Sequence, residues 1–175
     1  MKVWVTASMP RLSMNRKVHL LEILQLDETL QQKYNRLIER LRTYGKLAVA
    51  FSGGVDSTLL LRAAGEALGR DNALGIIASS ETLTKSEFES ALALAKEQGF
   101  RLKMVEYSEL GIGGYSENPI NRCYFCKKEL FGRLKEIARE EGIETRADGS
   151  SYEDLTDDYR PGMKAARELG VVSPL

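Results

Sequence analysis

Glycine, hydroxyl and carboxylate residues cluster at one point in the chain that could bind an anion. Two adjacent glycines let a backbone approach a ligand closely, and a helix beginning there would direct unpaired N–H groups and its positive dipole end at that ligand. Serine hydroxyls can donate to phosphate oxygens, and an aspartate can cap the helix or hold Mg²⁺. We therefore predict a phosphate-binding loop, with a tight strand-to-helix turn as the alternative. The residues are Ser52, Gly53, Gly54, Val55, Asp56 and Ser57.

Four further residues are candidates for chemistry. Cys123 and Cys126 lie three apart and could share a metal, but a closed zinc or iron–sulfur site needs about four ligands, so two thiols without a metal remain the alternative. Asp148 is expected at the end of a strand and could orient substrate or Mg²⁺; with Asp56 it is a candidate catalytic residue. Arg160 could pair with phosphate or carboxylate, although helix capping or surface pairing is an equal alternative.

Alternating strands and helices are expected to position these residues. Apolar runs predict strands at 47–51, 73–79, 102–107 and 144–147. Periodic patterns predict helices at 28–44, 56–68, 85–98, 123–141 and 162–169. In the second helix the residues expected to face inward are Leu59, Leu60, Ala63, Ala64, Ala67 and Leu68. The alternation predicts an α/β fold, a doubly wound and mostly parallel sheet with helices on both faces, which binds ligands at the carboxyl ends of its strands.

Composition narrows the class of protein. The chain has 175 residues, and its 25 Lys and Arg balance its 25 Asp and Glu. A chain without net positive charge gains little from releasing the counterions of a nucleic acid, so general nucleic-acid binding is not expected. Its longest uncharged runs are too short to span a membrane, and two cysteines without a disulfide framework indicate a reducing, cytoplasmic setting. We expect residues 1–27 to be a loosely ordered or partly helical extension, without a secretory signal, and residues 28–175 to be one domain.

Several motifs together resemble one protein family. The segment SGGVDS is similar to the PP-loop of the ATP pyrophosphatase superfamily, which has the adenine nucleotide alpha hydrolase-like fold, whereas neither a Walker motif nor Gly-x-Gly-x-x-Gly occurs. With NRCYFCKKELF, the pair Asp148 and Gly149, and DDYRPGMKAARELGVVSPL, it resembles the LarE family of sulfur transferases that help build the nickel-pincer nucleotide cofactor. The similarity runs from about residue 30 to the end, and it implies that residues 28–175 are a PP-loop ATP-binding domain. One departure is Ser150 and Ser151, where the family commonly has Thr-Asn.

The resemblance implies an activity and a set of ligands. Residues 52–57 would bind the pyrophosphate part of ATP with Mg²⁺, a substrate carboxylate would attack the α-phosphorus, and a sulfur nucleophile would displace AMP. The implied substrate is a small-molecule carboxylate, a pyridinium dicarboxylate mononucleotide, and a homo-oligomer is expected. In some members Cys123 and Cys126 would correspond to two of three ligands of a [4Fe–4S] cluster, the third coming from outside this chain.

The resemblance also implies a longer protein. Family members continue beyond the final Ser-Pro-Leu, so we expect this chain to be the ATP-binding part of a longer enzyme, or the product of a split or truncated gene. A PP-loop amide-forming ligase and a tRNA thiolase are alternative activities. A non-catalytic ATP-binding fragment is the alternative from a different functional class.

Overall fold

The computed structural model describes residues 29–79, 83–106, 122–151 and 161–175. The chain divides into two units, residues 1–36 and 37–175, and the site described below lies in the second. Residues 29–42 are helical, and Ile38 and Leu41 of this helix are buried. Residues 1–27 and Arg160 lie outside the described residues, so the expected extension and the role expected of Arg160 stay predictions.

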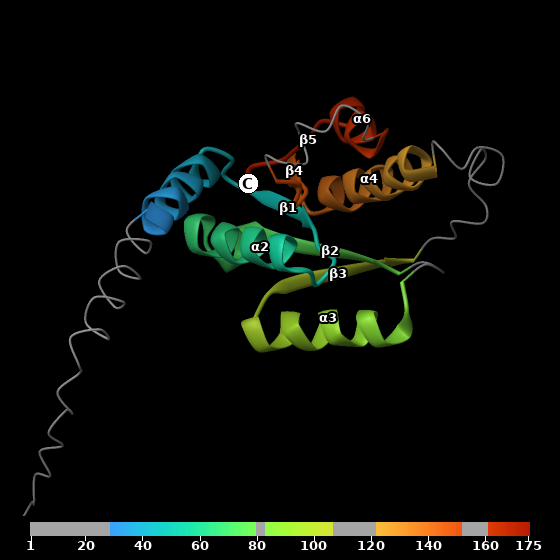
Figure 1. Ribbon diagram of the computed structural model, residues 1–175, viewed down its shortest axis with the longest axis horizontal. Helices are drawn as coiled ribbons and strands as arrows, with labels where there is room; N and C mark the ends of the chain where they lie inside the picture. Colours follow the sequence, from blue (N-terminus) through green and yellow to red (C-terminus); the bar gives the residue numbers. More distant parts are fainter. Residues whose placement is uncertain (1–28, 80–82, 107–121, 152–160) are drawn as a thin grey trace, which may run out of the picture. The chain divides into compact units, whose positions relative to one another are not determined.

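Within the second unit, five strands form one parallel sheet (Figure 1). The strands are β1 (Leu47–Ala50), β2 (Ala73–Ser79), β3 (Arg101–Glu106), β4 (Thr145–Ala147) and β5 (Val171–Val172). Their order is β3-β2-β1-β4-β5, so the first strand in sequence lies at the centre. Val49 of β1 is in register with Gly75 of β2 on one side and with Ala147 of β4 on the other.

Helices cover both faces of this sheet. They are α2 (Val55–Leu68), α3 (Lys85–Gln98), α4 (Arg122–Glu140) and α6 (Pro161–Glu168), with a short 3₁₀ turn, η1 (Arg70–Asn72). From β1 to β3 the chain advances in one direction across the sheet, and it then returns to β4 and β5 in the other. Because parallel crossovers are right-handed, this reversal places α2 and α3 on one face and α4 and α6 on the other, as Figure 1 shows.

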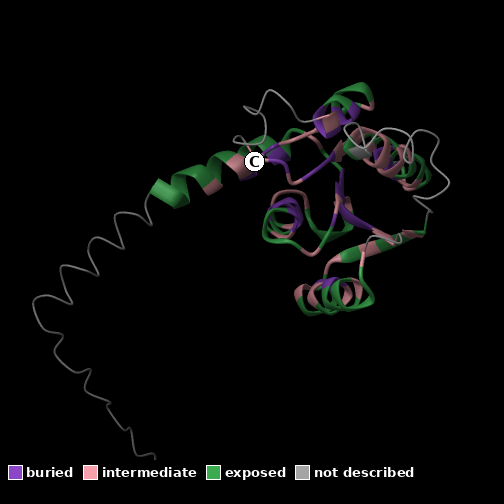
Figure 2. Ribbon diagram, turned by 45° about the vertical axis from the view of Figure 1, so that its right-hand side comes forward, coloured by how far each residue is buried: buried purple, intermediate pink, exposed green. Residues whose placement is uncertain are grey.

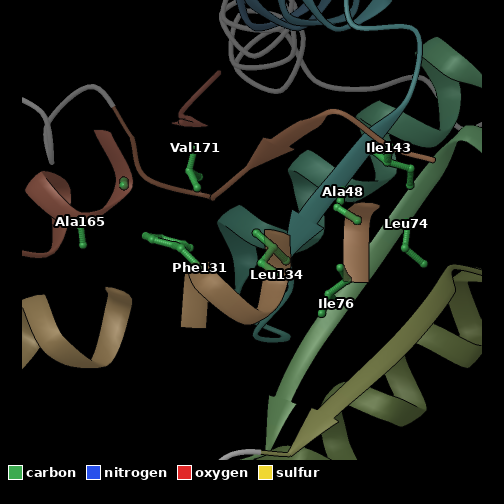
Figure 3. Close-up of a cluster of buried hydrophobic side chains, with 10 residues drawn as sticks. Ala48, Leu74, Ile76, Phe131, Leu134, Ile143, Ala165 and Val171 are labelled. Carbon is green, nitrogen blue, oxygen red and sulfur yellow. The ribbon is translucent and has the colours of Figure 1, made fainter. Parts of the chain in front are cut away.

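A cluster of buried hydrophobic residues lies between the sheet and the pair α4 and α6 (Figure 3). Phe131 and Leu134 of α4 are 1% and 0% exposed and pack in the same cluster as Ala48 and Ile76 of the two central strands. Figure 2 shows buried residues gathered along the inner strands and the helix faces that meet them. The small residues Ala165 and Ala166 let α6 join this cluster closely.

The ends of α3 follow from local sequence. Thr84 accepts a hydrogen bond from the backbone N–H of Glu87, and the Glu87 carboxylate accepts one from the Thr84 N–H, which confirms the predicted capping box. Gly99 ends the helix in the left-handed conformation, with φ of 65°. α3 is therefore held at both ends, and it presents Ala91 and Ala95 to the protein interior.

The predicted fold class is confirmed, and two details of the prediction were wrong. Leu59, expected to face inward, is 41% exposed, because the buried face of α2 is centred on Leu60, Leu61 and Ala64 instead. The strand β5 was not predicted, since its two residues are too few for a periodicity to be recognised. In the described part of the chain, no helix is long and apolar enough to cross a membrane.

Candidate functional site

The strands β1 and β4 define where a ligand would bind. They are neighbours in the sheet, yet the chain leaves them on opposite faces, through α2 after β1 and through α6 after β4. In parallel α/β sheets, a crevice forms at the carboxyl ends of strands where the winding reverses in this way. Both predicted loop segments, residues 52–57 and residues 148–150, follow these two strands.

The glycine loop takes a shape that only glycine allows at one position. Gly53 has φ of +78°, and a Cβ placed on it would lie 2.6 Å from the Cβ and 3.0 Å from the Cα of Ala91. The loop is therefore pressed against α3. Both the backbone conformation and the close approach require a residue without a side chain at this position.

The two serines of the loop bond mainly to the loop itself. The buried Ser57 hydroxyl accepts from the Ser52 N–H and donates to the Gly54 carbonyl, both at 3.2 Å. The Ser52 and Ser57 hydroxyl oxygens are also 3.2 Å apart. Gly54 is the N-cap of α2 and makes no side-chain cap hydrogen bond. The geometry is that of an anion cradle at a helix N-terminus, shaped by serine hydroxyls.

A cleft of about 280 Å³ opens beside this loop. It brings together the predicted Ser52, Gly54, Asp56 and Ser57 with Asp148, whereas Gly53 and Val55 do not line it. Val55 is 83% exposed. The complete lining is Ala50, Ser52, Gly54, Asp56, Ser57, Lys127, Leu130, Phe131, Asp148, Gly149 and Ser150.

The loop after β4 touches the start of α2. A Cβ on Gly149 would lie 2.9 Å from the backbone nitrogen of Ser57 and 3.2 Å from the carbonyl carbon of Asp56. These neighbours are backbone atoms and have little freedom to move aside. Gly149 is therefore needed for the two loops to meet and form the wall of the cleft.

Asp148 is a buried carboxylate, 6% exposed, and both of its oxygens are engaged. Oδ1 accepts from the Ser173 hydroxyl at 2.7 Å and from the Ser150 N–H at 3.3 Å. Oδ2 accepts from the Ser150 hydroxyl at 2.8 Å and lies 3.8 Å from Nζ of Lys127. A buried charge needs such partners, because burial without them is costly.

Lys127 is the cleft residue that the sequence reasoning missed. It extends from α4 past Gly162, where a Cβ would lie 2.6 Å from its Cδ, and its ammonium lies 5.9 Å from the centroid of the Phe131 ring. Its position four residues before Phe131 places both on one face of α4. Once α4 is known to flank the cleft, the four-residue spacing between Lys127 and Phe131 indicates that Lys127 lies on the face of α4 that lines it.

The two cysteines lie at the start of α4 and are not joined in a disulfide. Cys123 is exposed and Cys126 is half-buried. Among the described residues, no group of three His, Cys, Asp or Glu side chains is arranged to hold a metal ion. The described residues alone therefore do not fit an iron–sulfur cluster. The Asp56 carboxylate, exposed on the cleft wall, does fit Mg²⁺, which prefers oxygen ligands shared with phosphates.

The sequence matches one family model and several known proteins. The family described as NAD synthase matches residues 25–117, just over half of the chain. An uncharacterised protein of Synechocystis sp. is 41% identical over 146 residues, covering 83% of this chain and 54% of that protein. The pyridinium-3,5-bisthiocarboxylic acid mononucleotide synthase of Lactiplantibacillus plantarum is 39% identical over 147 residues, covering 84% of this chain and 53% of that enzyme.

A solved structure matches in fold. The NH3-dependent NAD synthetase of Campylobacter jejuni superposes with a TM-score of 0.63 at 17% sequence identity, over 74% of this chain and 60% of that one. The chain spans about half the length of the two relatives above. The family match includes the whole of β1, the glycine loop and α2. The chain therefore belongs to the NAD synthase family of PP-loop proteins.

Proposed function

We propose that this chain binds ATP with Mg²⁺ in the cleft at the carboxyl ends of β1 and β4, as the adenylating part of a sulfur transferase. The observation that carries the proposal is the cleft itself, where the glycine loop of a PP-loop protein meets a second loop at the point where the winding reverses. The 39% identity to the pyridinium-3,5-bisthiocarboxylic acid mononucleotide synthase supports the choice of reaction.

The loop and α2 are suited to hold the pyrophosphate part of ATP. The N–H groups at the start of α2, following the N-cap Gly54, would donate to phosphate oxygens, and the helix dipole favours their negative charge. Mg²⁺ bound by Asp56 and phosphate oxygens would neutralise charge on the departing pyrophosphate. The hydroxyls of Ser52 and Ser57 keep the loop in this form through their own hydrogen bonds.

The reaction would join a carboxylate to AMP. A carboxylate oxygen of the substrate would attack the α-phosphorus in line with the bond between that phosphorus and pyrophosphate. This bond breaks as the new one forms, and the products are an acyl adenylate and pyrophosphate. Lys127, the cation on the opposite wall of the cleft, is placed to attract the substrate carboxylate or the α-phosphate. In a sulfur transferase, a sulfur nucleophile would then displace AMP to give the thiocarboxylate. Arg160 stays a candidate for phosphate or substrate binding.

Two measurements test the proposal. Calorimetric titration with ATP and Mg²⁺ should show that the parent chain binds ATP. Gly54→Asp should abolish this binding, because it would place a negatively charged carboxylate next to the phosphates. Asp56→Ala should weaken it. Asp71→Asn, an exposed carboxylate of η1, is the matched control and should bind like the parent chain. ATP binding unchanged in Gly54→Asp would refute the loop assignment.

A turnover assay then distinguishes the candidate reactions. Pyrophosphate release that depends on a pyridinium dicarboxylate mononucleotide supports adenylation of that substrate. Amide formation is the second candidate, favoured by the NAD synthase family match, and it would give an amide product when ammonia replaces the sulfur donor. Binding of ATP without turnover of any carboxylate would identify a nucleotide-binding fragment.

A further inference from the structure

We infer that Ser173 and Asp148 are positioning residues that hold Lys127 in the cleft, and that Asp148 does not itself touch ATP or the metal. This inference rests on the proposed function for its role in ligand binding. It begins from the hydrogen bonds of the Asp148 carboxylate, which fill three of about four acceptor sites. Two serine hydroxyls and one backbone N–H donate to its oxygens, at 2.7, 2.8 and 3.3 Å.

A carboxylate so engaged has little capacity left for another ligand. It is 6% exposed, and the fourth group near it is the Lys127 ammonium, 3.8 Å from Oδ2. A metal ligand or a general base would need acceptor sites that these donors leave unoccupied. The geometry instead makes Asp148 a fixed negative charge beside Lys127 in the lining of the cleft.

Ser173 is brought to Asp148 by the edge strand β5. Ala147 of β4 is in register with Val172 of β5, and the Asp148 N–H donates to the Val172 carbonyl at 3.0 Å. The next residue along the chain, Ser173, is therefore held beside Asp148 by backbone hydrogen bonds. The short strand β5 therefore contributes to the site, because it places the Ser173 hydroxyl beside the Asp148 carboxylate.

Lys127 is guided from the other side. Gly162 of α6 leaves room for its aliphatic stem, and Phe131 lies beneath its ammonium, 5.9 Å from the ring centroid. The side chain is still 37% exposed, so part of it faces the cleft. A lysine has four rotatable bonds, and an anchor at Asp148 reduces the conformational entropy that it loses when it binds an anion.

The first test needs no ligand. Nitrogen-15 spectra of the lysine ammonium groups in the 175-residue chain should include a slowly exchanging signal from Lys127, assigned by its loss in Lys127→Met. The signal should disappear in Ser173→Ala and in Asp148→Asn, and it should return in Ser173→Thr, which restores the hydroxyl. A Lys127 signal that persists in Ser173→Ala would overturn the inference, as would its absence from the parent chain.

The second test measures binding of inorganic pyrophosphate with Mg²⁺ by calorimetry. Ser173→Ala should weaken binding about tenfold, the effect of losing a hydrogen bond to a charged group. Ser173→Thr should restore binding, and Ser90→Ala, an exposed serine of α3, should leave it unchanged.

A double-mutant cycle separates positioning from simple destabilisation. Added to Lys127→Met, the change Ser173→Ala should cost no further affinity, because the group that it positions is gone. An equal loss in both backgrounds would show a purely structural role and overturn the inference. If the parent chain fails to bind pyrophosphate, the proposed function fails, while the ammonium spectra still decide whether the network positions Lys127.

Discussion

Replacing Gly53 with alanine is the sharpest perturbation of the glycine loop. The added Cβ would lie 2.6 Å from the Cβ of Ala91, which is far closer than two carbon atoms approach in proteins. It would also force an alanine into a backbone with φ of +78°. We expect the loop to move away from α3 and the phosphate cradle to be lost.

The two penalties can be estimated separately. A positive φ costs alanine about 1–2 kcal/mol, and overpacking against a fixed neighbour costs about 1–3 kcal/mol, so Gly53→Ala should lower the free energy of unfolding by about 2–5 kcal/mol. Gly142→Ala is the matched control, because Gly142 has φ of +66° and no atom within 4 Å of its added Cβ. That control should show only the backbone cost of about 1–2 kcal/mol.

Urea denaturation gives both values, and a double mutant isolates the contact. Ala91→Gly alone costs about 1 kcal/mol as a glycine inside a helix. Combined with Gly53→Ala it should recover much of the overpacking penalty, since the colliding Cβ is removed. Equal destabilisation by Gly53→Ala and Gly142→Ala, with unchanged ATP affinity, would refute the reasoning.

Three further predictions concern other parts of the second unit. Phe131→Ala should lower the free energy of unfolding by about 3–5 kcal/mol in urea titrations, because the ring is 1% exposed and supports the cleft wall. Gly149→Ala should cost about 1–3 kcal/mol and weaken ATP binding in calorimetry, since its Cβ would collide with the backbone of Ser57; unchanged affinity would contradict this. A hydrogen bond from Lys103 lowers the pKa of Glu141 from its usual 4.5, so the ionised carboxylate stabilises the fold at neutral pH and this contribution is lost as the pH falls below about 4.5. Glu141→Gln should therefore be less stable than the parent at pH 7, and the difference in the free energy of unfolding should shrink as the pH falls below 4.5; a difference that does not change with pH would count against the pair.

Much of the fold could be predicted from local patterns. The strand at 73–79 was predicted with the bounds that the structure gives it, and the Thr84 capping box set the start of α3. These features depend on residues close together in sequence, such as an apolar run or a hydroxyl three residues before a glutamate. The exposure of Leu59 was missed, because the apolar residues of α2 cover more of its circumference than the sheet can bury.

The sequence by itself determined the glycine loop and its place between a strand and a helix, because type and spacing of neighbouring residues define that turn. It also contained Asp148, Lys127 and Ser173, without any sign that they meet. These three come from the loop after β4, from α4 and from the segment after β5, and only the order of strands in the sheet brings them together. Contacts between distant segments depend on which strands pair and which face each helix covers, so the tertiary structure alone decided that a buried carboxylate would anchor the lysine of the cleft.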